Sequence, residues 1–187
     1  VILFYFFGGC KSLTSLHINL KAPNALSTIG FFYNCTSLIS LNISEFDISS
    51  SYDMSYMFSG LKSLTSLDLS GLKISQVTTM SNMFKDSSSL ISINFTGFNT
   101  SKTTYMDKMF YGCSSLVSLD LSSFTLNQVI LDDFCNQCYS LKSIKFSNEI
   151  QLPSKVVSMF KDCFSLLSLN LSNFDFGIVE DMQYLFY

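Results

Sequence analysis

The sequence predicts an α/β repeat solenoid, with a parallel β-sheet on one face and short helical turns and loops on the other. Two observations predict it: a recurring unit of the form M-x-x-M-F-x-x-C-x-S-L-x-S-L-x-L-S-x-F, and a constant spacing of 25 or 26 residues between its leading leucines. A fixed period of this length over a whole chain is typical of stacked coils. The leading leucines are Leu13, Leu38, Leu64, Leu90, Leu116, Leu141 and Leu166.

The repeats predict one domain, a single solenoid over residues 1–187 with about seven units of 25–26 residues. Apolar residues make up 48% of the chain and charged residues 13%, a balance that favours a folded protein over a disordered one. A repeat array needs no central core, because each unit buries its apolar face against its neighbours. Since the first and last units are incomplete, we expect the chain to be a fragment truncated at both ends.

The strands are predicted where leucines alternate with polar residues. In LTSLDLSGL, Leu64, Leu67 and Leu69 fit the L-x-x-L-x-L pattern of leucine-rich repeats. The last two leucines point inward and leave the intervening residues outward, as a short strand requires. Strands at one fixed place in every coil lie in parallel about 4.8 Å apart. The sequence therefore predicts a leucine-rich-repeat-like sheet.

The helical turns are predicted from methionine spacing. Met80, Met83 and Phe84 are placed i, i+3 and i+4, which puts them on one face of a helix. Since methionine adapts to irregular packing, we expect this face to fill the core between coils rather than to bind a ligand. A second apolar column follows the strands and is also expected in the core; it contains Phe46, Leu72, Phe98, Phe124 and Phe174.

The repeat resembles the BspA-like leucine-rich repeats of surface proteins. The likeness rests on the M-F-x-x-C-x-S-L-x-S-L-x-L-S pattern and on stretches such as FDISSSYDM from Phe46 and FNTSKTTYM from Phe98. It implies a leucine-rich-repeat solenoid on a microbial or protist cell surface, with a role in adhesion or protein binding. The resemblance brings no catalytic residues. Leu61 and Ser87 depart from the pattern, because they stand where the other units carry cysteine.

Five cysteines share one position in the repeat, three residues before the leading leucine. Adjacent coils could bring such residues within disulfide range, but equivalent side chains in parallel coils point the same way. We expect them to be buried as free thiols, as small apolar residues are. Cys135 forms a lone C-x-x-C with Cys138, too little for a zinc site. The shared column contains Cys10, Cys35, Cys113, Cys138 and Cys163.

Composition argues against several functions. His17 is the only histidine, and nucleophilic triads and most catalytic metal sites need one, so we expect no enzyme, metal or cofactor. The net charge is -3 and all eleven basic residues are lysines, so we expect no nucleic-acid partner. No apolar run reaches the ~18 residues of a membrane helix, so we expect no membrane insertion within this segment.

The outward strand positions offer a candidate binding face. The second residue after each leading leucine is serine in all seven units, whereas the fourth varies. Two interpretations are open: solvated side chains beside small serines that let strands pair, or a shallow recognition surface like those of many repeat proteins. We refer to the variable positions as the outward column, which contains His17, Asn42, Asp68, Asn94, Asp120, Lys145 and Asn170.

The functional hypothesis is a non-enzymatic cell-surface or secreted repeat protein that mediates adhesion by binding a protein or glycan through the solenoid face. An intracellular leucine-rich-repeat scaffold for protein-protein interaction is the alternative. N-x-[ST] sequons bear on the first hypothesis, because sugars on the outward column would cover this face. The sequons begin at Asn34, Asn42, Asn94, Asn99 and Asn170.

Overall fold

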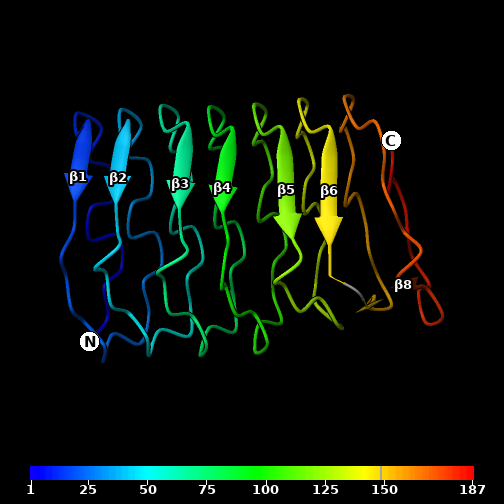
Figure 1. Cartoon of the computed structure of the whole chain (residues 1–187), viewed down its shortest axis with the longest axis horizontal. Coiled ribbons are helices and arrows are strands. Elements are labelled where there is room, and N and C mark those ends of the chain that lie inside the picture. The colour runs from blue at the N-terminus through cyan, green and yellow to red at the C-terminus, as the bar shows by residue number, and fades with distance from the viewer. Residues whose placement is uncertain (148) are drawn as a thin grey trace.

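The computed structural model describes residues 1–147 and 149–187 and shows a β-solenoid of about six turns. Successive coils stack along the long axis of the molecule (Figure 1). Each coil places its strand beside the equivalent strand of a neighbouring coil, and the pairings are parallel and in register. The solenoid and the parallel strands predicted from the repeat are therefore confirmed.

The strands are short, because only two to four residues of each coil have strand geometry. The expected single sheet is divided into two-stranded sheets, β1–β2, β3–β4, β5–β6 and β7–β8, and Figure 1 shows the first six strands grouped two by two. Because strands of this length form few hydrogen bonds, a small increase in the distance between neighbouring coils ends the pairing. The strands are β1 (Ser15–His17), β2 (Ser40–Asn42), β3 (Ser66–Asp68), β4 (Ser92–Asn94), β5 (Ser118–Leu121), β6 (Ser143–Phe146), β7 (Ile150–Gln151) and β8 (Phe174–Asp175).

The predicted helical turns are wrong, because the described part of the chain contains no helix. The Met-x-x-Met-Phe stretch instead forms consecutive tight turns; for example, Met57 N–H donates to the Met54 carbonyl three residues back. Tyr56 (φ 58°) and Gly60 (φ 73°) adopt left-handed geometry, which interrupts a right-handed helix. Residues spaced for a helical face thus reach the core through a different backbone.

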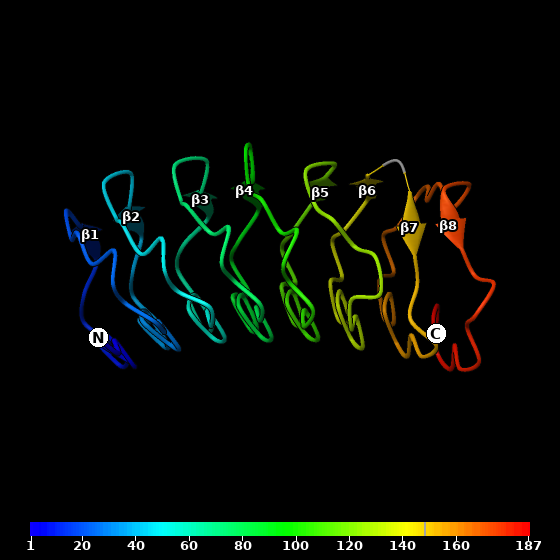
Figure 2. The ribbon, with the colours of Figure 1, turned by 90° about the horizontal axis from the view of Figure 1, so that it is seen from below.

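Alternate N–H groups of this stretch point out of their own coil and donate to the next one. Met54, Tyr56, Phe58 and Gly60 donate to the carbonyls of residues 79, 81, 83 and 85 at 2.8–3.1 Å. An α-helix would have used these groups within the coil. We call this stretch, residues 53–61 and its equivalents, the inter-coil seam. Figure 2 shows the tight turns along the side opposite the first six strands.

The seam begins at a ladder of isolated parallel β-bridges. Its bridges run without interruption through Ile2, Ser27, Asp53, Thr79, Tyr105 and Ile130. It is therefore more continuous than the strand pairs. Seam hydrogen bonds join all neighbouring coils, whereas the strand pairs β1–β2, β3–β4 and β5–β6 join alternate ones.

The core consists of the predicted apolar columns. Met80, Met83 and Phe84 are fully buried, as are their equivalents in most coils, so their expected role in packing is confirmed. The seam phenylalanines stack face to face, with Phe58–Phe84 centroids 5.5 Å apart and Phe84–Phe110 centroids 5.4 Å apart. Aromatic contacts of this kind stabilise the fold beyond the effect of the apolar area that they bury.

Cys135 interrupts this aromatic stack. It follows Phe134 as Phe110 follows Met109, so it occupies the phenylalanine position of its coil. Phe134 packs edge-on against Phe110 at 5.2 Å. The two cysteines of the lone C-x-x-C therefore belong to different columns. Cys135 stands in the phenylalanine column, and Cys138 stands in the cysteine column.

Gly60→Ala tests the left-handed turn. A Cβ at residue 60 would adopt an unfavourable φ and collide with the Asn34 side-chain oxygen, so we expect a loss of about 1–3 kcal/mol in the free energy of unfolding, measured by urea denaturation. The matched control is Gly71→Ala, whose Cβ would lie 3.5 Å from the Ser44 carbonyl oxygen without a positive φ. We expect that control to change stability by less than about 1 kcal/mol. Equal effects of the two substitutions would contradict the assigned turn.

Candidate binding face

The structure brings the outward column together on one exposed face. All seven residues are exposed, and the strand register pairs His17 with Asn42, Asp68 with Asn94 and Asp120 with Lys145. The serine column beside them is exposed in every coil as well. The candidate residues therefore form a contiguous surface, as parallel strands in register require.

Most acidic and amide members of this column also shape the backbone. Asn42 Oδ1 accepts the Ser44 N–H at 3.0 Å, and Asp68 Oδ1 accepts the Ser70 N–H at 2.9 Å. A side-chain oxygen that accepts a bond two residues on forms an Asx-turn, which ends the strand and reverses the chain. Asn94, Asp120 and Asn170 do the same.

The Asx-turn was missed in the sequence, although its signal is visible. A hydroxyl residue follows the outward column by two positions in most units, as in Asn42–Ser44 and Asn94–Thr96. This pattern explains three of the sequons as turn signals. Thr96 uses both its N–H and its hydroxyl to donate to Asn94 Oδ1.

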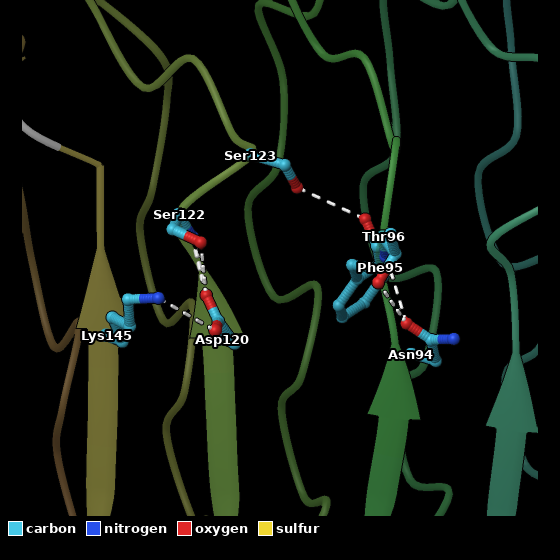
Figure 3. Close-up of polar contacts among 7 residues, drawn as sticks. All are labelled: Asn94, Phe95, Thr96, Asp120, Ser122, Ser123 and Lys145. Carbon is cyan, nitrogen blue, oxygen red and sulfur yellow. Dashed lines mark hydrogen bonds and ion pairs between the residues drawn. The ribbon is translucent and has the colours of Figure 1, made fainter.

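Neighbouring members of the column also bond to each other within a strand pair. Asn94 Nδ2 donates to Asp68 Oδ1 at 3.0 Å. Lys145 Nζ lies 3.2 Å from Asp120 Oδ2, a contact that Figure 3 shows. Because both members of the Lys145 pair are largely exposed, this ion pair adds little to stability. It nevertheless fixes where the charges lie on the face.

The turns lower the pKa of the aspartates. For Asp68 the main cause is the Ser70 N–H, followed by the Ser70 hydroxyl, with a smaller effect of the Asn94 amide. For Asp120 the Ser122 hydroxyl and N–H lower the pKa first, and Lys145 adds to the effect. Donors that bind the charged carboxylate favour it over the acid. Both side chains are therefore anionic at neutral pH.

Two clefts open where one strand pair ends and the next begins. Cleft A lies between β2 and β3, has a volume of about 370 Å³ and is lined by Asn42, Ser44, Asp68, Ser70 and Gly71 together with apolar residues. Cleft B lies between β4 and β5 and has a volume of about 310 Å³. Its polar lining consists of Asn94, Thr96, Asp120, Ser122 and Ser123.

The two clefts differ at several equivalent positions, one of which carries a contact between coils. In cleft B, Ser123 Oγ donates to the Phe95 carbonyl at 3.2 Å and ties the two coils together (Figure 3). The equivalent residue in cleft A is Gly71, which has no side chain to make this bond.

The cysteine column has a different role, because its thiols bond to the backbone. Cys113 Sγ and Cys138 Sγ donate to the carbonyls of Phe84 and Phe110 in the preceding coil, at 3.1 and 3.2 Å. Ser87 makes the same bond to Phe58 at 2.7 Å, which explains why serine replaces cysteine there. All six cysteines are free, although Cys10 is exposed rather than buried.

Burial makes the inner thiols poor nucleophiles. It is the main cause that raises the pKa of Cys35, Cys113, Cys135 and Cys163, and the pKa of Cys163 rises to about 12. A thiol with a high pKa is rarely in the reactive thiolate form. The column therefore serves packing and inter-coil hydrogen bonding.

The described residues show neither a metal-binding cluster nor a membrane-spanning helix. Within residues 1–147 and 149–187, no group of three or more His, Cys, Asp or Glu side chains could hold a metal ion. His17 lies on β1, where its register partner is Asn42. The described chain also has no helix of the length and apolarity that crossing a membrane would need.

Comparison with protein families identifies the family of this chain. A family model described as "Mycoplasma protein of unknown function, DUF285" matches residues 26–151, which is most of the chain. The chain belongs to the DUF285 family. In this DUF285 protein the matched segment runs from the coil before β2 to β7 and includes both clefts. Neither a curated protein nor a solved structure matches the sequence.

Native thiol labelling tests the cysteine column. We expect a disulfide reagent at pH 8 to modify Cys10 rapidly and the other five cysteines at least tenfold more slowly, because those thiols are buried or have raised pKa values. Mass spectrometry after timed quenching would locate each label. A Cys10→Ser variant is the control and should lose the fast phase. Rapid labelling of Cys113 or Cys138 would contradict the assigned burial.

The Asx-turn at Asp68 predicts a dependence of stability on pH. Because its folded-state pKa is lowered, its contribution is complete above the unfolded pKa and is lost as the pH falls below about 4. Asp68→Asn keeps the turn acceptor but removes the titration. Urea denaturation at pH 7 and pH 3 should therefore show a smaller loss of stability in this variant than in the wild type. Glu180→Gln is the control for charge removal and should retain the wild-type difference.

Proposed function

We propose that this chain is a non-enzymatic, cell-surface or secreted repeat protein that mediates adhesion by binding a protein or glycan ligand through its strand face. The observation that carries the proposal is the pair of equivalent clefts on that face, whose polar lining comes from the outward column and its turns. Buried columns keep the scaffold constant, while the exposed positions change from coil to coil. Extended recognition surfaces of repeat proteins are built in this way.

The strand face suits this role better than the seam edge. At the seam, four backbone hydrogen bonds join most pairs of neighbouring coils, so changes there endanger the stack. The outward column makes few bonds beyond its own turn and its strand partner. Asn, Asp, Lys and His alternate there without contact with the core. Such freedom is what a recognition surface needs.

The likeness to BspA-like repeats supports the surface location. The match to the DUF285 family supports a repeat protein, and the description of that family names no function. Apolar side chains near the outward column add contact area, since Ile39 is 62% and Ile91 is 47% exposed. We expect these side chains to flank a bound ligand.

One observation favours the intracellular scaffold as a second candidate. All six cysteines are free thiols, and a chain with several cysteines and no disulfide is more typical of a reducing compartment. The strand face would then bind an intracellular protein. The same face carries both candidates, so surface labelling of intact cells with an antibody to the chain separates them.

Matched lysine substitutions test the proposed face. Ser92→Lys places a long cation at the centre of the strand face, and Thr104→Lys places one on the opposite edge; both residues are exposed. The wild-type chain would be presented to an array of extracellular proteins and neutral glycans. We expect binding to at least one of them, a loss of at least tenfold in Ser92→Lys and no loss in Thr104→Lys.

The opposite pattern would overturn the proposed location. Loss of binding in Thr104→Lys with retention in Ser92→Lys would assign the ligand to the seam edge. Circular dichroism and urea denaturation of both variants check that the solenoid is intact. Turnover of any array component by the chain would contradict a non-enzymatic role.

A further inference from the structure

Cleft A and cleft B repeat with a period of two coils. Asn42 and Asn94 are 52 positions apart in the sequence, as are Asp68 and Asp120. Two coils at a paired-strand spacing of about 4.8 Å separate the clefts by at least about 10 Å. A ligand that occupies both must therefore present equivalent groups at about this interval. Linear polymers with a two-unit repeat meet this requirement.

The period has a structural cause in strand pairing. Within a pair, cross-strand bonds such as Asn94 Nδ2–Asp68 Oδ1 hold the outward column together. Between pairs, the described residues include no named strand pairing of β2 with β3 or of β4 with β5. The clefts occupy those two positions. Their spacing is thus built into the fold.

The lining of each cleft combines polar rims with an apolar floor. The rim of cleft A offers the Asn42 amide, the Asp68 carboxylate and the Ser70 hydroxyl. Ile43 and Leu72 lie beneath them and are buried. The apolar residues of cleft B are Ile93, which is half-buried, and Phe95, which is buried. A ligand that fits presents hydroxyl groups along its edges and C–H groups on its face.

The charges select against an anionic ligand. Asp68 and Asp120 are both ionised at neutral pH, and the whole chain lacks arginine, the usual bidentate partner of phosphate and carboxylate. Lys145 is paired with Asp120. Carboxylate acceptors bind hydroxyl donors strongly. Neutral sugars satisfy these conditions, and an extended disaccharide has about the length that separates the clefts.

We propose that cleft A and cleft B are successive subsites for a neutral, linear glycan whose disaccharide repeat spans two coils. This inference rests on the proposed strand-face function and names its ligand. Asp68 and Asp120 accept sugar hydroxyls, and the side-chain amides of Asn42 and Asn94 supply further hydrogen-bonding groups. Cleft A, where Gly71 has no side chain, accommodates the bulkier substituents.

Isothermal titration with β-1,4-linked glucose oligomers tests the spacing. A disaccharide fills one cleft, whereas a tetrasaccharide reaches both. Because linked subsites raise the effective concentration of the second contact, we expect the tetrasaccharide to bind at least tenfold tighter than the disaccharide.

Two variants each disable one cleft while preserving the fold. Gly71→Gln fills cleft A, and a larger side chain is tolerated there because Glu45 stands at the equivalent place in the preceding coil. Asp120→Asn weakens cleft B but keeps the Asx-turn, which asparagine already forms at Asn42 and Asn94. Either variant should reduce the tetrasaccharide affinity to within threefold of the disaccharide value. Gly71→Ala, which leaves cleft A open, should bind like the wild type.

Three results would overturn the inference. Equal affinities of the disaccharide and tetrasaccharide for the wild type would show that the clefts do not act together. Unchanged tetrasaccharide binding in both Gly71→Gln and Asp120→Asn would locate it elsewhere. Failure to bind glucose, N-acetylglucosamine or mannose oligomers, with an array protein bound and lost in Ser92→Lys, would remove the glycan but leave the proposed strand-face function. If Ser92→Lys also left that protein bound, both proposals would fail.

Discussion

Backbone hydrogen bonds between neighbouring seams are the interaction on which the rest of this solenoid depends. Most coil interfaces contain four of them, such as those from Met80, Asn82, Phe84 and Asp86 to the next coil. At about 1 kcal/mol net for each bond, one interface gains on the order of 4 kcal/mol, and the seam also supplies this between β2 and β3 and between β4 and β5, which do not pair as strands. The regular donors also fix the register, and register aligns the Phe, Met and Cys columns. Stacking of buried columns then follows from the same bonds.

The seam geometry explains residue choices that hydrophobicity alone does not. The two left-handed residues of each seam lie four positions apart, as Tyr56 and Gly60 do. The second of them directly precedes the cysteine column, and Gly, Asn, Asp or Gln fills it in every coil. Glycine adopts positive φ without strain, and Asn and Asp are enriched there; Gln137 is the exception. The position is filled by Gly9, Asn34, Gly60, Asp86, Gly112, Gln137 and Asp162.

This position also shows which structural features could be predicted from the sequence and which could not. The repeat predicted the solenoid, its inward leucines, its buried methionines and the exposure of the outward column, because burial follows a simple period. The helical turn was wrong because i, i+3 and i+4 spacing cannot distinguish an α-helix from tight turns that donate outward. The glycine, asparagine and aspartate before the cysteine column carried the missing information. The clefts were not predictable, since they depend on which short strands pair and which separate.

The seam holds neighbouring coils together, whereas the strand face is exposed, so the two edges tolerate substitution differently. A side chain in the outward column can change without loss of a seam bond, provided that it still ends its strand. Asparagine and aspartate both do so, and they differ by one charge and in the donor capacity of the amide. Lys145 departs from this rule and is followed by a different path, in which β7 begins at Ile150 and pairs with β8 instead of continuing the row of β1–β6. The alternation of Asn42, Asp68, Asn94 and Asp120 is therefore the longest run in which the turn-forming residues coincide with the proposed recognition surface, and both clefts lie within it.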